Sequence, residues 1–323
     1  MTSHSILRKA ALFALCFTIA SCTNLSEVNS WSQISLEATQ YNQVVSTYAD
    51  TPRRLARYDH FLPAENDWLA QADIRDAQAE SLKQLLSVVS DYMSALEALS
   101  TDTTPTTTQD VKTLNDSFGR LNTALPANKQ VSKATLNAAG SILQTVLDAS
   151  KKAYQAKQIA LVIESANPNL QTILGEQGDL YKIVNEDFRR DLELESLKQN
   201  SHYRDFKADG NLIGDKSDKK SKDNNPLPKC VEKMVGPCEI DKSQKPSRAA
   251  VEALEEWQAI RKSENAKRKH VLEVYLSVLK NVAKGHQKLY DNRNKLGSKK
   301  FANELAPLVI SLRKQVTILA TFN

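Results

Sequence analysis

Apolar residues at helical spacing constrain the fold of this 323-residue chain more than any other feature of its sequence. Between Pro63 and Leu99 they recur every three or four positions, at Leu82, Leu85, Leu86, Val89, Tyr92, Met93, Leu96 and Leu99. This spacing gathers them on one face of an α-helix, which must be buried against other helices. The same pattern predicts helices near residues 31–49, with a restart after Pro52, and near 107–125, 132–166, 167–206, 247–296 and 298–323.

Glycine and proline are scarce and separate the helical segments. The chain has only 9 Gly and 10 Pro, and every proline lies at or near a point where the helical pattern stops. At 1.5 Å per residue, a helix over residues 63–99 would be about 55 Å long. We therefore predict an all-α fold, an elongated antiparallel bundle of about six or seven helices forming a single domain over residues 31–323.

Individual residues predict several helix ends. Ser132 and Ser298 should cap the N-termini of two helices. Asn167 followed by Pro168 is typical of a cap and the first residue of a new helix. Gly297 should end the helix that starts near residue 247.

Residues 207–246 form a long polar insert, rich in Lys, Asp, Ser, Asn and Pro and poor in apolar residues. We expect a surface loop here. It contains Cys230 and Cys238, for which a disulfide is the simplest expectation, because a closed loop of this size would stabilise the fold by about 2.5 kcal/mol. A zinc site is the alternative, but there is no Cys-x₂-Cys spacing and no histidine nearby in sequence.

Charge and hydrophobicity exclude several classes of protein. The 43 Lys and Arg residues against 38 Asp and Glu give a net charge of +5, too small for a polycationic nucleic-acid binder, so no nucleic-acid partner is expected. A hydrophobic content of 41% argues against a wholly disordered chain. No internal segment approaches the roughly 20 apolar residues of a membrane-spanning helix.

The N-terminus has the pattern of a secretion signal. Arg8 and Lys9 precede an apolar segment from Ala10 to Ala20, which is too short to span a membrane. The segment ends in Ile19-Ala20-Ser21-Cys22, which resembles the lipobox of bacterial lipoproteins. The resemblance covers residues 1–22. An ordinary cleaved signal with an incidental cysteine, or an N-terminal anchor helix, is the alternative interpretation.

The lipobox resemblance implies processing and an address. Residues 1–21 would be a signal peptide cleaved between Ser21 and Cys22, and Cys22 would carry two acyl chains, palmitate among them, which together give a stable membrane anchor. Residues 22–30 would be a lipidated tether, whose polar part could extend about 26 Å at most. Thr23 stands where Asp marks inner-membrane retention in enteric lipoproteins, so the resemblance favours the outer membrane, with the body in the periplasm.

One segment resembles an enzyme. The residues Val162-Ile163-Glu164-Ser165-Ala166-Asn167-Pro168 resemble the Glu-Ser-x-x-Asn-Pro segment of lytic transglycosylases, helical enzymes that cleave peptidoglycan. The resemblance implies that Glu164 is the general acid. The Ser-to-Asn spacing is one residue short, and no Gly-Leu-Met-Gln-like segment follows. The alternative is that two helices meet at Asn167.

Charged clusters on helices have two interpretations. The segment 261–270 contains five basic residues against Glu264, namely Arg261, Lys262, Lys267, Arg268 and Lys269. They could contact an anionic lipid, lipopolysaccharide or another anionic polymer, or form a solvated face with Glu264 bridging to Lys267 and Arg268. For Arg53, Arg54 and Arg57, and for the charged residues of 186–195, an exposed helix face is expected.

The remaining motifs give no positive indication of catalysis. The histidines are scattered singly, and there is no nucleophile elbow, no phosphate-binding loop and no recognisable metal or cofactor site. The sequence therefore favours a non-enzymatic, lipid-anchored envelope protein acting as a helical scaffold or adaptor for an envelope protein or polymer. The alternatives are a lytic transglycosylase-like enzyme and a protein that binds anionic lipid or lipopolysaccharide.

Overall fold

The computed structural model describes residues 25–58, 62–107, 110–123, 125–127, 130–151, 156–208 and 248–322. These residues are helical throughout their regular elements, with no strand among them. The elements are α2 (Ser26–Thr39), α3 (Gln43–Ala49), α4 (Thr51–Ala56), α5 (Leu62–Ser100), α6 (Val111–Thr123), α7 (Lys133–Ser150), α8 (Ala156–Leu174), α9 (Asp179–Lys182), the π-helical segment η2 (Ile183–Phe188), α10 (Arg189–Ala208), α11 (Arg248–Asp291) and α12 (Lys299–Ala320). Within these ranges, no helix combines the length and apolar character that a membrane span requires.

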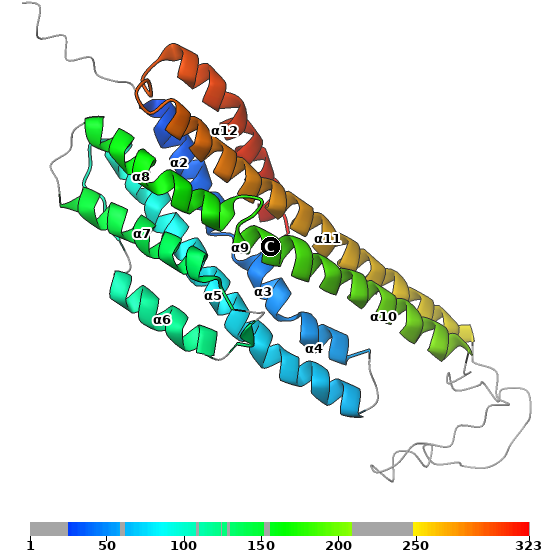
Figure 1. Ribbon diagram of the computed structural model, residues 1–323. Helices are drawn as coiled ribbons and strands as arrows, with labels where there is room; N and C mark the ends of the chain where they lie inside the picture. The colour runs from blue at the N-terminus through cyan, green and yellow to red at the C-terminus, as the bar shows by residue number, and fades with distance from the viewer. Residues whose placement is uncertain are drawn as a thin grey trace, which may run out of the picture.

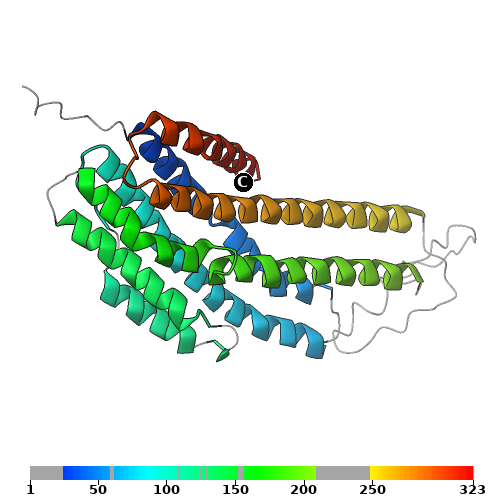
Figure 2. The same cartoon turned by 45° about the horizontal axis from the view of Figure 1, so that its top comes forward.

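The helices form an elongated antiparallel bundle, which confirms the predicted fold class (Figure 1). Its longest member, α11, has 44 residues, about 66 Å at 1.5 Å per residue. At one end of the bundle the start of α2 lies beside the turn between α11 and α12 (Figure 1). At the other end, α10 packs against both α11 and α4, and α4 packs against α5 (Figure 2).

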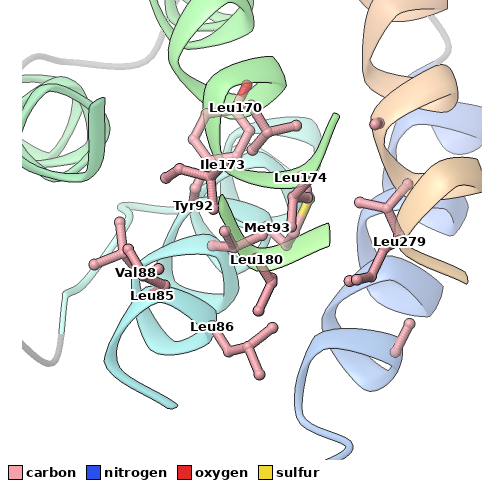
Figure 3. Packing of buried hydrophobic residues seen from close by; sticks show 14 of the residues in the cluster. Leu85, Leu86, Val88, Tyr92, Met93, Leu170, Ile173, Leu174, Leu180 and Leu279 are labelled. Carbon is pink, nitrogen blue, oxygen red and sulfur yellow. The ribbon is translucent and has the colours of Figure 1, made fainter. Parts of the chain in front are cut away.

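The core follows the apolar faces that the sequence predicts. The predicted face of α5 is buried, with each of its eight apolar residues between 0 and 2% exposed. Figure 3 shows Leu85, Leu86, Val88, Tyr92 and Met93 of α5 near Leu170, Ile173 and Leu174 of α8, with Leu180 of α9 and Leu279 of α11 around them. Each side chain of this size contributes about 1.5–3 kcal/mol when it leaves water. The core therefore joins helices that are distant in sequence.

The first helix differs from the prediction at both ends. It starts at Ser26 and stops at Thr39, and α3 begins at Gln43. The proposed tether over residues 22–30 is therefore too long, since residues from Ser26 onward are helical. The physical reason is that Leu25 and Val28 are only 6% and 0% exposed, because Val28 lies one turn from the core residue Trp31.

The predicted break at Asn167-Pro168 is wrong. The chain turns earlier, between Ser150 and Ala156, where α7 and α8 form an antiparallel hairpin. Pro168 lies inside α8, and Asn167 is buried at 6% exposure. The prediction failed because the contacts of Asn167 with other helices, described below, outweigh its local preference for a cap.

The helix that contains Pro168 ends instead at a pair of glycines. A Cβ atom on Gly175 would lie 2.4 Å from the carbonyl oxygen of Gln171, and one on Gly178 would lie 2.4 Å from that of Ile173. Only residues without a side chain allow the backbone to approach so closely. The chain then continues through α9 and η2 into α10.

The predicted serine caps are confirmed. The Ser132 hydroxyl accepts a hydrogen bond from the amide of Thr135 at 3.2 Å, and the Ser298 hydroxyl accepts one from the amide of Phe301 at 3.2 Å. The helix before Ser298 ends at Asp291, not at Gly297 as predicted. Ser21, Cys22, Cys230 and Cys238, and the polar insert from residue 209 onward, lie outside the described residues; residues 207 and 208 belong to α10.

Candidate functional site

A half-enclosed pocket lies where α4, α10 and α11 meet. Its volume is about 240 Å³, and it is lined by Arg54, Arg57, Tyr58, Glu195, His202, Trp257, Arg261 and Arg268. We call it the arginine–aromatic pocket. Trp257, Arg261 and Arg268 share one face of α11 because they are four and seven residues apart. Glu195 and His202 share one face of α10 for the same reason.

A buried carboxylate organises the inner part of the pocket. Glu195 is 1% exposed, and both of its carboxylate oxygens accept from Nε of Arg54 at 3.1 Å. Arg268 donates to the same carboxylate at 3.2 Å. Arg54 also donates to the carbonyl oxygen of Thr47 and to the hydroxyl of Thr51, each at 2.9 Å. Arg54 and Glu195 therefore satisfy each other's charge inside the fold and join α4 to α10.

The predicted basic set on α11 divides into two groups. Arg261 and Arg268 line the pocket and donate to Glu264 at 2.9 and 3.5 Å. The predicted bridge from Glu264 to Arg268 is thus present, and its second partner is Arg261 in place of Lys267. Lys262 and Lys267 are exposed, whereas Lys269 is partly exposed.

Arg57 provides the uncompensated charge of the pocket. Arg57 is exposed, and no carboxylate in the described part of the chain lies within 4 Å of its guanidinium group. The carboxylates of Glu195, Glu264 and Asp50 pair with the other arginines, the last at 3.3 Å from Arg54. The four arginines of the lining are thus opposed by three carboxylates, of which Glu195 lines the pocket and Glu264 and Asp50 lie beside it. One net positive charge remains, which suits an anion.

Three aromatic rings form one wall of the pocket. The centroid of Tyr58 lies 5.9 Å from that of His202 and 6.3 Å from that of Trp257, and the centroids of His202 and Trp257 are 5.5 Å apart. Tyr58 meets both neighbours edge to face, an arrangement that stabilises aromatic pairs. Burial, followed by the charge of Glu195, raises the pKa of the Tyr58 phenol.

A second buried ion pair lies one helical turn before Glu195. Asp191 accepts from Arg75 of α5 at 2.6 Å, and Arg75 also donates to Gln78 at 3.2 Å and to the hydroxyl of Tyr48. Arg75 is 8% and Asp191 6% exposed. The two acids of α10 thus attach this helix to α5 and α4, which fixes the position of the pocket wall.

The expectation of an exposed face is wrong for Arg54 and for two acids of residues 186–195, although Glu186, Arg190 and Glu193 are exposed. Arg54, Asp191 and Glu195 are buried, because α4 and α10 pack against each other and against neighbouring helices. A signal was present in the sequence: Phe188 and Leu192 are apolar residues at helical spacing within the charged segment, and both are buried. Asp191 is adjacent to Leu192 in sequence, and Glu195 follows Leu192 by about one helical turn. Both acids therefore lie partly on the same buried face.

Glu164 lies on α8 in a different environment. Its carboxylate accepts from Arg293 at 3.1 Å, and its side chain is 48% exposed. It is not among the residues that line the arginine–aromatic pocket. Asn167, one turn away, points instead to His286 and Gln287 of α11, at 2.8 and 2.9 Å.

Neither a search for metal-binding residues nor comparisons with known proteins indicate a function. Within the described ranges, no group of three or more His, Cys, Asp or Glu residues could hold a metal ion. No protein-family model, curated protein or solved structure matches the chain.

Proposed function

We propose that this protein is a non-enzymatic, lipid-anchored protein of the cell envelope that acts as a helical scaffold or adaptor, and that it holds its partner at the arginine–aromatic pocket. The composition of the pocket carries the proposal. Arginine, tryptophan and tyrosine dominate its lining, and these side chains contribute most of the binding energy at protein–protein interfaces when they cluster in a pocket.

The position of the pocket supports a protein that reaches away from its anchor. Near the start of the described chain, Trp31 of α2 packs against Gly285 of α11. Trp257 precedes Gly285 by 28 residues on the same helix, about 42 Å at 1.5 Å per residue. The start of α2 and the pocket therefore lie toward opposite ends of the bundle (Figures 1 and 2).

The short connection to the proposed anchor strengthens this argument. Leu25, where the described chain begins, follows Cys22 by three positions, which can span about 10 Å at most. If Cys22 is lipidated and the body is periplasmic, one end of the bundle stays at the membrane surface. A bundle that stands away from the membrane would then present the pocket to a partner several nanometres from the lipid.

An experiment in cells tests the adaptor function directly. A photo-crosslinking residue replaces Ile260, which is 50% exposed and adjacent to Arg261, in the full-length protein. The matched control replaces Ile310 of α12, an isoleucine that is 70% exposed. We expect a specific protein adduct from position 260 and not from position 310, identified by mass spectrometry.

Two other outcomes would count against the adaptor. Adducts from position 260 that contain only lipid or polysaccharide would favour the anionic-polymer alternative, to which exposed Lys262 and Lys267 would contribute. The same adducts from both positions would indicate unspecific contact. Fractionation of a Cys22→Ser variant tests the anchor separately, because a protein without acyl chains should leave the membrane fraction.

A further inference from the structure

We infer that the arginine–aromatic pocket binds the C-terminal carboxylate of a peptide, with the terminal side chain held against the aromatic wall. This inference deepens the proposed function and rests on it in one respect, that the partner is a protein. Four steps lead from the pocket and the exposed lysines on the same helix to this ligand.

The first step is the supply of hydrogen-bond donors. A guanidinium group has five N–H donors in a planar fork that matches a carboxylate. Arg57 is exposed and has no carboxylate within 4 Å among the described residues. Arg261 is 34% exposed at its side chain and forms its ion pair through one nitrogen, Nη1. Both residues therefore have donors available to a ligand.

The second step is that the inner part of the pocket is already occupied by an acid of the chain itself. The carboxylate of Glu195 is clamped by Arg54 and Arg268, and its side chain is only 2% exposed. This internal pair stabilises the arrangement of the lining without a ligand. A second carboxylate would have to bind further out, on the side of Arg57 and Arg261.

The third step is size. A volume of about 240 Å³ lies just below the roughly 300–1,000 Å³ of typical small-molecule pockets, which suits one amino-acid residue and its carboxylate. Tyr58, His202 and Trp257 provide apolar surface for the side chain of such a residue. A terminal residue offers both groups that this lining can bind, a carboxylate and a side chain, and capture of a terminal carboxylate is a known mode of peptide recognition.

The fourth step is the charge around the pocket. Lys262 and Lys267 are exposed on the same stretch of α11 as Arg261 and Arg268. Exposed cations near a binding site attract an anionic ligand and increase its association rate. They do not discriminate between ligands that have the same charge, so discrimination should come from the arginines and the aromatic wall.

Two pairs of small probes test the inference on the purified full-length protein by saturation-transfer NMR and calorimetry. N-acetylphenylalanine and its amide differ only in the carboxylate. N-acetylmuramic acid and N-acetylglucosamine differ by the acidic lactyl group and represent a saccharide ligand. We expect saturable binding of N-acetylphenylalanine, about tenfold weaker binding of its amide, and weaker binding of both sugars.

Variants identify the site. Arg57→Gln should weaken binding of N-acetylphenylalanine about tenfold, and Arg57→Lys should restore only part of it because lysine lacks the fork. Arg120→Gln on α6 removes another exposed arginine and should leave binding unchanged. Circular dichroism should show the same helicity and melting temperature for all three variants, since both arginines are exposed.

Several results would overturn the inference: no saturable binding of the free acid, equal binding of acid and amide, or no effect of Arg57→Gln. Selective binding of N-acetylmuramic acid alone would assign the pocket to an acidic saccharide instead. The crosslinking experiment from position 260 is independent of these probes. A protein adduct without carboxylate selectivity would leave the adaptor proposal standing and reject the inference. Carboxylate selectivity without any protein adduct would reject the adaptor proposal and, with it, the assignment of a protein as the source of the carboxylate.

Discussion

His286 shows at the scale of one residue how the bundle uses buried polar groups. It is 0% exposed, and Asn167 Oδ1 lies 2.8 Å from its Nδ1. The amide nitrogen of Asn167 donates to Gln287, so Oδ1 accepts and Nδ1 carries the proton. The hydroxyl of Tyr92 then donates to Nε2 at 2.5 Å. The ring is neutral and connects α11 to α8 and α5.

The pKa of His286 predicts a pH dependence of stability. Burial lowers the pKa from 6.5 to about 3 in the folded protein. Between these values the unfolded chain binds the extra proton, so the contribution is complete above pH 6.5 and is lost as the pH falls toward 3. We expect this residue to lower the free energy of unfolding by about 2 kcal/mol between pH 7.5 and 5.

Urea unfolding at several pH values measures this effect. His286→Gln keeps a polar side chain but cannot titrate, so the variant should be less stable at neutral pH and should lose less stability on acidification than the unmodified protein. Parallel pH curves for the two proteins would show that His286 does not titrate on unfolding as argued.

The ion pair between Arg75 and Asp191 predicts a large effect of a single truncation. Asp191→Ala leaves the guanidinium of Arg75 buried without its carboxylate, which should cost about 3–5 kcal/mol. The matched control is Asp116→Ala, which breaks a pair with Lys112 whose side chains are 53% and 87% exposed, at a cost below about 1 kcal/mol. Chemical denaturation compares the two, and similar losses would contradict the assignment of a buried pair.

Single-residue roles were the least predictable part of the structure. The apolar positions of α5 follow from spacing alone, because every third or fourth residue must face the core. The burial of Arg54, Asp191 and Glu195 does not, because a charged residue looks the same in sequence whether it meets water or a partner from another helix. The pairing of Arg54 with Glu195 joins residues 141 positions apart, and no local pattern specifies it.

At the scale of helices, one glycine sets the contact between α2 and α11. A Cβ atom at Gly285 would lie 2.1 Å from Nε1 of Trp31 and 2.8 Å from Cε2. The indole therefore packs directly on the backbone of α11, beside the ring of His286 at a centroid distance of 6.0 Å. The absence of a side chain on α11 is what allows the two helices to approach.

Alanine substitutions distinguish packing from helix propensity. Gly285→Ala should destabilise the fold by about 1–3 kcal/mol because Trp31 must move. Gly119→Ala on α6, where an added Cβ would meet nothing within 4 Å, should stabilise by about 0.5–1 kcal/mol because alanine favours the helix. Thermal unfolding measures both, and a stabilising Gly285→Ala would mean that Trp31 does not pack on that backbone.

Helix existence was predictable and several helix ends were not. Ser132 and Ser298 acted as caps because the hydroxyl and the amide that it satisfies are neighbours in sequence. Asn167-Pro168 has equally good local chemistry, yet lies within α8, because the side chain of Asn167 finds its partners on α11. A capping residue predicts a helix start reliably only where its side chain has no competing partner on another helix.

At the scale of the whole molecule, the arginine–aromatic pocket and the start of α2 lie toward opposite ends of the bundle (Figures 1 and 2). α11 passes from the arginine–aromatic pocket at Trp257 to the α2 contact at Gly285, and its 44 residues form one continuous helix. The sequence predicted a long helix here but could not place the pocket, which needs residues from α4, α10 and α11 together. Only the packing of the three helices brings them to one place.

If Cys22 carries the proposed lipid anchor, this separation predicts different distances from the membrane for the two ends of the bundle. A fluorophore attached at position 299, an exposed lysine at the start of α12 near the beginning of α2, should be quenched by brominated lipids in reconstituted vesicles. A fluorophore at position 57 in the pocket, about 40 Å further along the bundle, should not be quenched, since such quenching requires near-contact.

The contrast between the two positions discriminates an upright bundle from one that lies on the surface. Equal quenching at positions 57 and 299 would place the pocket and its lysines against the headgroups, and would support lipid contact over a protein partner. A Cys22→Ser variant, which lacks the acyl chains, should lose the quenching at position 299, and this shows that the signal depends on the anchor. Quenching that persists in this variant would mean that α2 or α12 binds lipid by itself.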